Sequence, residues 1–176
     1  TEADAGKGIW RERDYENIDG LITNVPGLTL VTFFADCVPL YFVDPVHHAI
    51  GLSHSGWKGT VHRMGQKTIE AMGEAFGTKP EDLRVCIGPS ICRDCYEVSE
   101  DADAFKEEFG AEISQDDSTS CYSWNGKSIL MNKGNGKYQL DLWGANRLVL
   151  LDAGILPEHL AVTNVCTKCN PDLLYS

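Results

Sequence analysis

Residues 28–59 read LTLVTFFADCVPLYFVDPVHHAIGLSHSGWKG, and the fold we expect is built around this stretch. Leu28–Phe34 and Leu40–Val43 are rich in β-branched and aromatic residues, which predicts two buried strands. Asp44-Pro45 indicates a turn, and the apolar residues at alternate positions of His48–Ser53 predict a third strand that returns as a hairpin. Three short strands would therefore converge on one group of polar residues.

The rest of the chain mixes helical and strand patterns without strict alternation. Apolar residues recur at helical spacing over Val61–Phe76 and again after Asp141, while β-rich runs lie at Leu83–Ile87 and Leu160–Val165. This mixture favours an α+β fold, an irregular α/β sandwich in which mixed β-sheets are flanked by helices. No linker or repeat divides residues 1–176, so we expect a single domain.

The composition excludes several classes of protein. Lys and Arg number 15 against 26 Asp and Glu, a formal net charge of −11, so no binding to nucleic acid or to an anionic membrane surface is expected. Asp36 and Pro39 interrupt the most apolar stretch, which falls short of the roughly 18 apolar residues of a transmembrane helix. Thr1–Asp4 lacks the basic and apolar regions of a secretory signal. We expect a soluble, cytoplasmic protein.

Two polar motifs carry the candidate chemistry, Ala35–Pro39 and Ser53–Gly59. A thiolate and a neutral imidazole at neighbouring strand ends are natural zinc ligands, and they are equally a nucleophile and its base. Cys37 and His54 are therefore the candidate catalytic pair, with Asp36 as the nearest carboxylate. The residues alone do not decide between zinc ligands and a nucleophile with its base. A packed core cysteine beside a structural histidine is the third interpretation.

The residues that follow the candidate histidine predict a ligand site. Gly56 permits close approach of a ligand, Trp57 offers a stacking face, and Lys58 supplies a positive charge. His62 and Arg63 lie in the first turn of the expected helix, where they would join Lys58 in holding an anion. A solvated helix start is the alternative.

Seven cysteines, an odd number, indicate reduced thiols rather than a disulfide framework. Four of them form two Cys-x-x-Cys pairs, Cys92/Cys95 and Cys166/Cys169. A zinc ribbon separates its two pairs by roughly 15–20 residues, whereas 70 residues separate these. We therefore interpret the pairs as reduced surface or core thiols, with a structural zinc site built from both pairs as the alternative.

Five ordered motifs resemble the YfiH family, also called the laccase-domain family, long labelled polyphenol oxidase and later understood as purine nucleoside phosphorylases. The motifs run through most of the chain: Ala35–Pro39, His54–Gly59, Ile87–Ile91 with Tyr96–Val98, Leu140–Arg147 and Cys166–Ser176. The resemblance implies phosphorolysis of adenosine, inosine, guanosine and methylthioadenosine, and deamination of adenosine. It also implies a catalytic zinc bound by two His and one Cys. Copper is disfavoured, because the chain lacks the repeated His-x-His clusters of a multicopper centre.

Carried over residue by residue, Cys37 and His54 match two of the three zinc ligands. The third family ligand is a His upstream of the Asp-Cys motif, and no His precedes Cys37 in this chain. Together with the absence of an initial Met and the end at Ser176, this suggests a chain trimmed at both ends, which would hold zinc weakly. The expected partners are purine nucleosides and phosphate, and a homodimer is compatible with this interpretation.

Two other functions stay open. The first is a Cys-His hydrolase that uses Cys37 as nucleophile and His54 as base. The second is a zinc-stabilised binding module that uses the Cys-x-x-Cys pairs and performs no catalysis.

Overall fold

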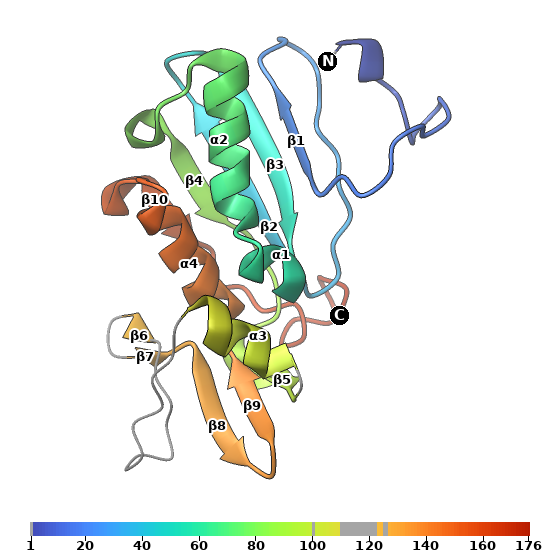
Figure 1. The fold of residues 1–176 in the computed structure, drawn as a ribbon. Coiled ribbons are helices and arrows are strands. Elements are labelled where there is room, and N and C mark those ends of the chain that lie inside the picture. The colour runs from blue at the N-terminus through green and yellow to red at the C-terminus, as the bar shows by residue number, and fades with distance from the viewer. Residues whose placement is uncertain (1, 100, 110–122, 125–126) are drawn as a thin grey trace.

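A five-stranded sheet lies at the centre of the fold in a computed structural model of the chain, which describes residues 2–99, 101–109, 123–124 and 127–176 (Figure 1). Its strands are β1 (Gly20–Thr23), β2 (Val38–Asp44), β3 (Ala49–Ser55), β4 (Arg84–Ile87) and β10 (Leu160–Val162). They lie in the order β1-β3-β2-β4-β10, antiparallel except for the parallel pair of β4 and β10. The expected mixture of strands and helices is confirmed.

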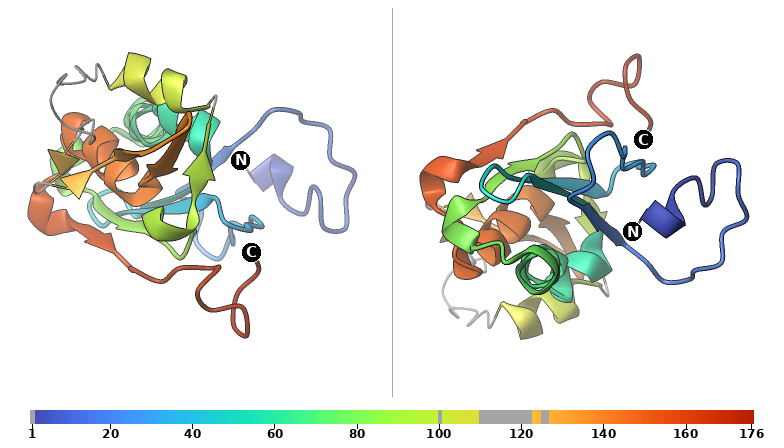
Figure 2. Two further views of the ribbon diagram at one scale, coloured as in Figure 1. Left: turned by 90° about the horizontal axis from the view of Figure 1, so that it is seen from below. Right: turned by 90° about the horizontal axis from the view of Figure 1, so that it is seen from above.

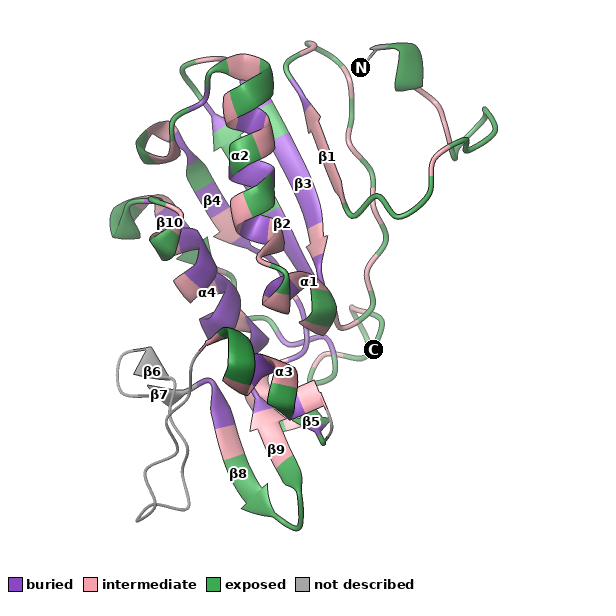
Figure 3. Ribbon diagram, viewed as in Figure 1, coloured by how far each residue is buried: buried purple, intermediate pink, exposed green. Residues whose placement is uncertain are grey.

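The β2–β3 hairpin was predicted from its residues and is present. Its register runs from Val38 opposite Ser55 to Asp44 opposite Ala49. Side chains of β2 alternate as a pleated strand requires: Phe42 is buried, as are its neighbours two residues away on either side, while the residues between them are exposed. One face of the sheet therefore enters the core, as Figure 3 shows.

Three helices cover that face: α1 (Trp57–Val61), α2 (Met64–Phe76) and α4 (Leu142–Asp152) (Figure 1). Ile69 and Met72 of α2 and Val149 of α4 are almost fully buried, and each such side chain contributes about 1.5–3 kcal/mol of transfer free energy. No helix among the described residues is long and apolar enough to span a membrane.

A smaller antiparallel sheet lies beyond the N-terminal end of α4. Its middle strand is β9 (Lys137–Leu140), between β5 (Glu97–Val98) and β8 (Leu130–Gly134). Helix α3 (Asp101–Glu108) lies beside it, and β6 (Ser123–Trp124) pairs with β7 (Lys127–Ser128). Single turns of 3-10 helix complete the described elements: η1 (Glu2–Asp4), η2 (Pro80–Asp82), η3 (Arg93–Cys95) and η4 (Pro157–His159).

The prediction of a strand at Leu28–Phe34 is wrong. The place beside β3 is taken by β1, which the sequence did not predict, and the other edge of β2 is taken by β4. Residues 28–34 run outside the sheet, and Phe33 is 93% exposed. A β-rich composition reports how well side chains fit a half-buried sheet, so it does not by itself make a segment pair with a strand.

The helix predicted from Val61 is divided. Its first part, α1, begins earlier at Trp57, and Arg63 then adopts a left-handed conformation with φ of 55° before α2 begins. The ends of α4 match the prediction better: Asp141 Oδ1 accepts the backbone N–H of Gly144 at 3.0 Å as an N-cap. Figure 2 shows that the segment before β1 extends away from these elements.

Candidate metal centre and substrate cavity

The antiparallel register of β2 and β3 brings Cys37 and His54 together. Cys37 immediately precedes β2, and Pro39 lies opposite His54 in the ladder. The two side chains lie close together, since a Cβ at Gly56 would lie 2.8 Å from Cys37 Sγ and 3.9 Å from His54 Cε1. The hairpin thus places a thiol and an imidazole at neighbouring strand ends.

Asp19, in the loop before β1, orients the His54 ring. Its Oδ1 lies 3.0 Å from His54 Nδ1, and the backbone N–H of His54 donates to the Asp19 carbonyl at 2.7 Å. Hydrogen bonding to Cys37, and secondly to Asp19, raises the pKa of His54 to about 9 against the lowering effect of burial. With Nδ1 engaged by a carboxylate, Nε2 is the ring nitrogen left for Cys37 or for a metal ion.

Gly56, the residue before α1, leaves room for the side chain of Cys37. A Cβ at this position would lie 2.8 Å from Cys37 Sγ, closer than such atoms approach. Gly56 therefore has a steric role in the site, in addition to any contact with a ligand.

Hydrogen bonds from Ile91 and Thr167 fix the position of Asp36. Its backbone has φ of 45°, a left-handed conformation that Asp adopts more readily than most residues. Thr167 Oγ1 donates to Asp36 Oδ1 at 2.7 Å, and the Ile91 N–H donates to the Asp36 carbonyl at 2.9 Å. The carboxylate predicted beside the thiol is thus fixed by segments from two distant parts of the chain.

The residues predicted to hold an anion are dispersed. Trp57 packs against the core, with Lys58 Nζ 5.3 Å from its ring centroid. His62 is exposed. Arg63 lies between two carboxylates, with Glu108 Oε1 and Asp152 Oδ2 each at 3.1 Å from its guanidinium.

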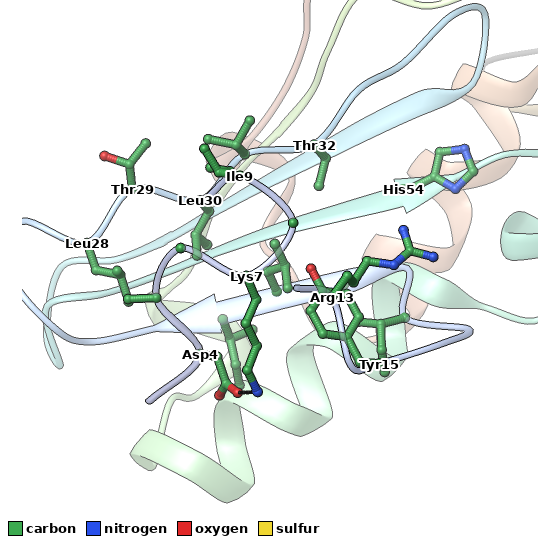
Figure 4. A pocket seen from close by; sticks show the side chains of 18 of the residues that line it. Asp4, Lys7, Ile9, Arg13, Tyr15, Leu28, Thr29, Leu30, Thr32 and His54 are labelled. Carbon is green, nitrogen blue, oxygen red and sulfur yellow. Dashed lines mark hydrogen bonds and ion pairs between the residues drawn. The ribbon is translucent and has the colours of Figure 1, made fainter. Parts of the chain in front are cut away.

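A cavity of about 460 Å³ reaches the candidate pair at His54 (Figure 4). It lies between the N-terminal segment and residues 28–33, and His54 lies at one end of it. Arg13 and Tyr15 are on its wall, whereas the five residues predicted to bind substrate are not in its lining. Thr32 also lines it, and Thr32 Oγ1 is buried without a hydrogen-bond partner among the described residues.

Asp19, Arg13 and Thr32 are site residues that the sequence interpretation missed. Nothing local marks them, because each lies in coil and enters the site only through the fold. Asn146 was also missed, although it left a signal: a polar residue on the buried face of an amphipathic helix. It accepts a hydrogen bond from Ser55 Oγ at 2.7 Å.

The two Cys-x-x-Cys pairs, interpreted from the sequence as reduced surface or core thiols, are free and lie together in the fold. Cys92, Cys95, Cys166 and Cys169 lie together, with their sulfur atoms all within 4.8 Å of one another. The long sequence separation was misleading, because β4 and β10 are parallel neighbours and the two pairs follow their C-terminal ends.

Residues 2–176 match the family described as "Multi-copper polyphenol oxidoreductase laccase". The chain belongs to this laccase-domain family. The purine nucleoside phosphorylase YlmD of Bacillus subtilis is 37% identical over all of the chain and 59% of its own length. The adenosine deaminase RL5 of an unknown prokaryotic organism is 32% identical over 94% of the chain and 58% of its own length.

Solved structures of family members share the fold. YlmD from Geobacillus stearothermophilus has a TM-score of 0.76 and 34% identity over 91% of this chain and 55% of its own. YfiH from Bacillus licheniformis has a TM-score of 0.75 and 34% identity over 90% and 55% of the two chains. The present chain thus spans somewhat more than half the length of these laccase-domain relatives.

Proposed function

We propose that the protein is a zinc-dependent purine nucleoside phosphorylase that also deaminates adenosine. The observation that carries the proposal is the meeting of Cys37 and His54, oriented by Asp19, at the end of a cavity large enough for a small ligand. The names of the laccase-domain relatives support the two reactions. Adenosine, inosine, guanosine and methylthioadenosine are the proposed substrates.

The donors at this site fit zinc. Sulfur of Cys37 and nitrogen of His54 are ligand atoms that zinc favours, and a carboxylate on the other ring nitrogen is the usual partner of a metal-bound histidine. When bound, zinc would supply a Lewis acid beside the substrate. We propose zinc rather than copper at this site.

Asp36 is the proposed proton carrier for deamination. Thr167 occupies one of its carboxylate oxygens, so the group is oriented rather than free to rotate. In the cavity, the Tyr15 ring offers a face on which a purine could stack.

Phosphorolysis needs a cation for phosphate, whose oxygen attacks the ribose carbon as the bond to the base breaks. Lys58, with His62, is the proposed phosphate contact, because Arg63 is already paired with Glu108 and Asp152. Arg13 is a second candidate, since it lies on the cavity wall. The net charge of −11 makes such local cations necessary for an anionic substrate.

The test is the release of hypoxanthine from inosine by the full-length protein, measured with and without phosphate. We expect strict dependence on phosphate, loss of activity in Cys37→Ala and His54→Ala, and normal activity in Cys86→Ala, whose cysteine lies in β4. Lys58→Met should raise the KM for phosphate about tenfold, as the loss of a charge-assisted hydrogen bond worth about 1.5 kcal/mol predicts. Lys67→Met on α2 is its control, and Arg13→Met decides between the two cations.

A Cys-His hydrolase is the second candidate, because Cys37, His54 and Asp19 also form a nucleophile, a base and an orienting carboxylate. In that case an electrophile would trap Cys37 covalently in metal-free protein that remains active. That result, or phosphate-independent activity, would overturn the phosphorylase proposal.

A further inference from the structure

The four clustered cysteines have the spacing of ligands around a single ion. A tetrahedral zinc with bonds of about 2.3 Å places its sulfur ligands roughly 3.8 Å apart. Here the four Sγ atoms lie within 4.8 Å of one another, and Cys95 Sγ is 3.5 Å from Cys169 Sγ. All four cysteines are free, since a disulfide requires about 2.05 Å. An iron–sulfur cluster would hold its thiolates farther apart, around a body several ångströms across.

The fold brings the two pairs together by continuing the sheet. Beyond the parallel strands β4 and β10, Ser90 and Cys166 form a further parallel bridge. The Ser90 N–H donates to the Val165 carbonyl at 3.1 Å, and the Thr167 N–H donates to the Ser90 carbonyl at 3.2 Å. Each Cys-x-x-Cys pair then turns back over this extension. The cluster is therefore built on backbone pairing, not on chance proximity of surface side chains.

A backbone N–H group points at one of the sulfur atoms. Cys166 Sγ accepts the N–H of Cys92 at 3.3 Å. This hydrogen bond joins the two pairs and stabilises a thiolate at Cys166. The positive charge of Lys168, between the last two cysteines, would offset part of the net charge of −2 on a zinc tetrathiolate.

We propose that Cys92, Cys95, Cys166 and Cys169 bind one structural zinc ion, at a site that shares no ligand with the Cys37–His54 pair. Binding releases the thiol protons to solvent as four zinc–sulfur bonds form. The ion joins the segment after β4 to the C-terminal segment, adding to the hydrogen bonds that Ser90 and Cys92 already make with Val165, Cys166 and Thr167.

This site supports the loop that carries Asp36 and Cys37. Thr167, between two of the ligands, donates to Asp36 Oδ1, and Ile91, next to Cys92, donates to the Asp36 carbonyl. The zinc ion thus holds both segments that fix Asp36, so its removal loosens the candidate active site without touching its own residues.

Metal analysis of the purified full-length protein tests the proposal. We expect Cys37→Ala, which removes the other metal candidate, to retain one zinc per chain, and Cys86→Ser to behave as wild type. Cys169→Ser should bind zinc more than 100-fold more weakly, because losing even a partner that only orients a ligand costs about 10–100-fold. Cys169 is exposed, so this variant is expected to fold; Cys95→Ser is the second. Cobalt added in place of zinc should give the intense visible bands of a tetrahedral thiolate site in Cys37→Ala.

Three outcomes would overturn it: no zinc in Cys37→Ala, unchanged zinc affinity in Cys169→Ser, or iron in place of zinc. None depends on nucleoside chemistry, so failure here is distinguishable from failure of the proposed enzyme activity.

Hydrogen exchange gives a readout of the structural role. After chelation of the metal, the amides of Ile91 and Thr167 should exchange at least tenfold faster. The amide of Phe42 within the β2–β3 ladder should change much less. Equal acceleration at all three positions would mean global unfolding and would contradict a local role in holding the Asp36 loop.

Discussion

Asp44 shows how one buried carboxylate fixes the register on which the site depends. Its Oδ1 accepts the backbone N–H groups of Val46 at 2.8 Å and His47 at 3.0 Å, and its Oδ2 lies 2.8 Å from His47 Nδ1. This closes the turn at the register pair Asp44–Ala49, and the same ladder sets Pro39 opposite His54. A slip by one residue would move every side chain of the hairpin to the opposite face.

Stability should depend on the ionisation of Asp44. Burial acts to raise its pKa, but the hydrogen bonds it accepts outweigh this and lower the pKa to about 2 from the ordinary 3.8. Because the folded-state pKa is the lower one, the stabilisation is fully present above pH 4 and is lost as pH falls through 2. Asp44→Asn should cost about 1–3 kcal/mol at pH 7, and this difference should shrink toward pH 2.

Urea unfolding at pH 7, 4 and 2.5 measures this difference, with Glu74→Gln on the exposed side of α2 as control. A difference between Asp44→Asn and wild type that stays constant down to pH 2.5 would contradict the role of the ionised carboxylate.

Helix α4 shows how a secondary element positions the site from a distance. Asn146 is fully buried, accepts from Ser55 Oγ, and donates from Nδ2 to Thr60 Oγ1 and to the Leu142 carbonyl, both at 2.9 Å. Ser55 follows His54 in β3, and Thr60 belongs to α1. This one side chain therefore joins α4 to the strand that contains the candidate histidine and to the helix that follows it.

Asn146→Ala should therefore destabilise the protein by about 2 kcal/mol or more, because it removes three buried hydrogen bonds that contribute about 0.5–1.5 kcal/mol each. Asp152→Ala, on the same helix, breaks only a largely exposed ion pair with Arg63 and should cost about 0–1 kcal/mol. Denaturant titration of both variants makes the comparison. A smaller loss in Asn146→Ala than in Asp152→Ala would refute the structural importance of the amide.

Elements with local signals were predictable, and elements that depend on distant partners were not. The end of α4 carries its own signal: the Gly154 N–H donates to the Leu151 carbonyl and the Ile155 N–H to the Leu150 carbonyl, as a glycine-terminated helix requires. By contrast, residues 28–34 have strand composition but pair with no strand of the sheet. The Cys37–His54 pair lay within one hairpin and was found from spacing, whereas the four-cysteine cluster required the parallel pairing of β4 with β10.

The molecule as a whole consists of a core and a loosely attached N-terminal segment. Several side-chain bonds of residues 3–14 lie within the segment: Arg11 donates to the carbonyls of Ala3 and Ala5, and Lys7 pairs with Asp4 and Asp14. Among the described residues, the first hydrophobic side chain that packs against the core is Ile22 in β1. Local opening of such a segment costs little free energy compared with global unfolding.

Trypsin should therefore cut first at Arg11 or Arg13, both exposed, and leave a folded product that begins near residue 14. Lys133 and Lys137 are exposed too, but they lie in the paired strands β8 and β9 and each binds Glu97, so cleavage there should be slower. Mass spectrometry over a time course, followed by thermal unfolding of the product, tests both points. The product keeps Cys37 and His54 but loses one wall of the cavity, residues 4–9, so nucleoside affinity should fall while the melting temperature changes by only a few degrees. Early cleavage in the β8–β9 hairpin, or collapse of the melting temperature after loss of the segment, would show instead that the N-terminal residues are part of the folded core.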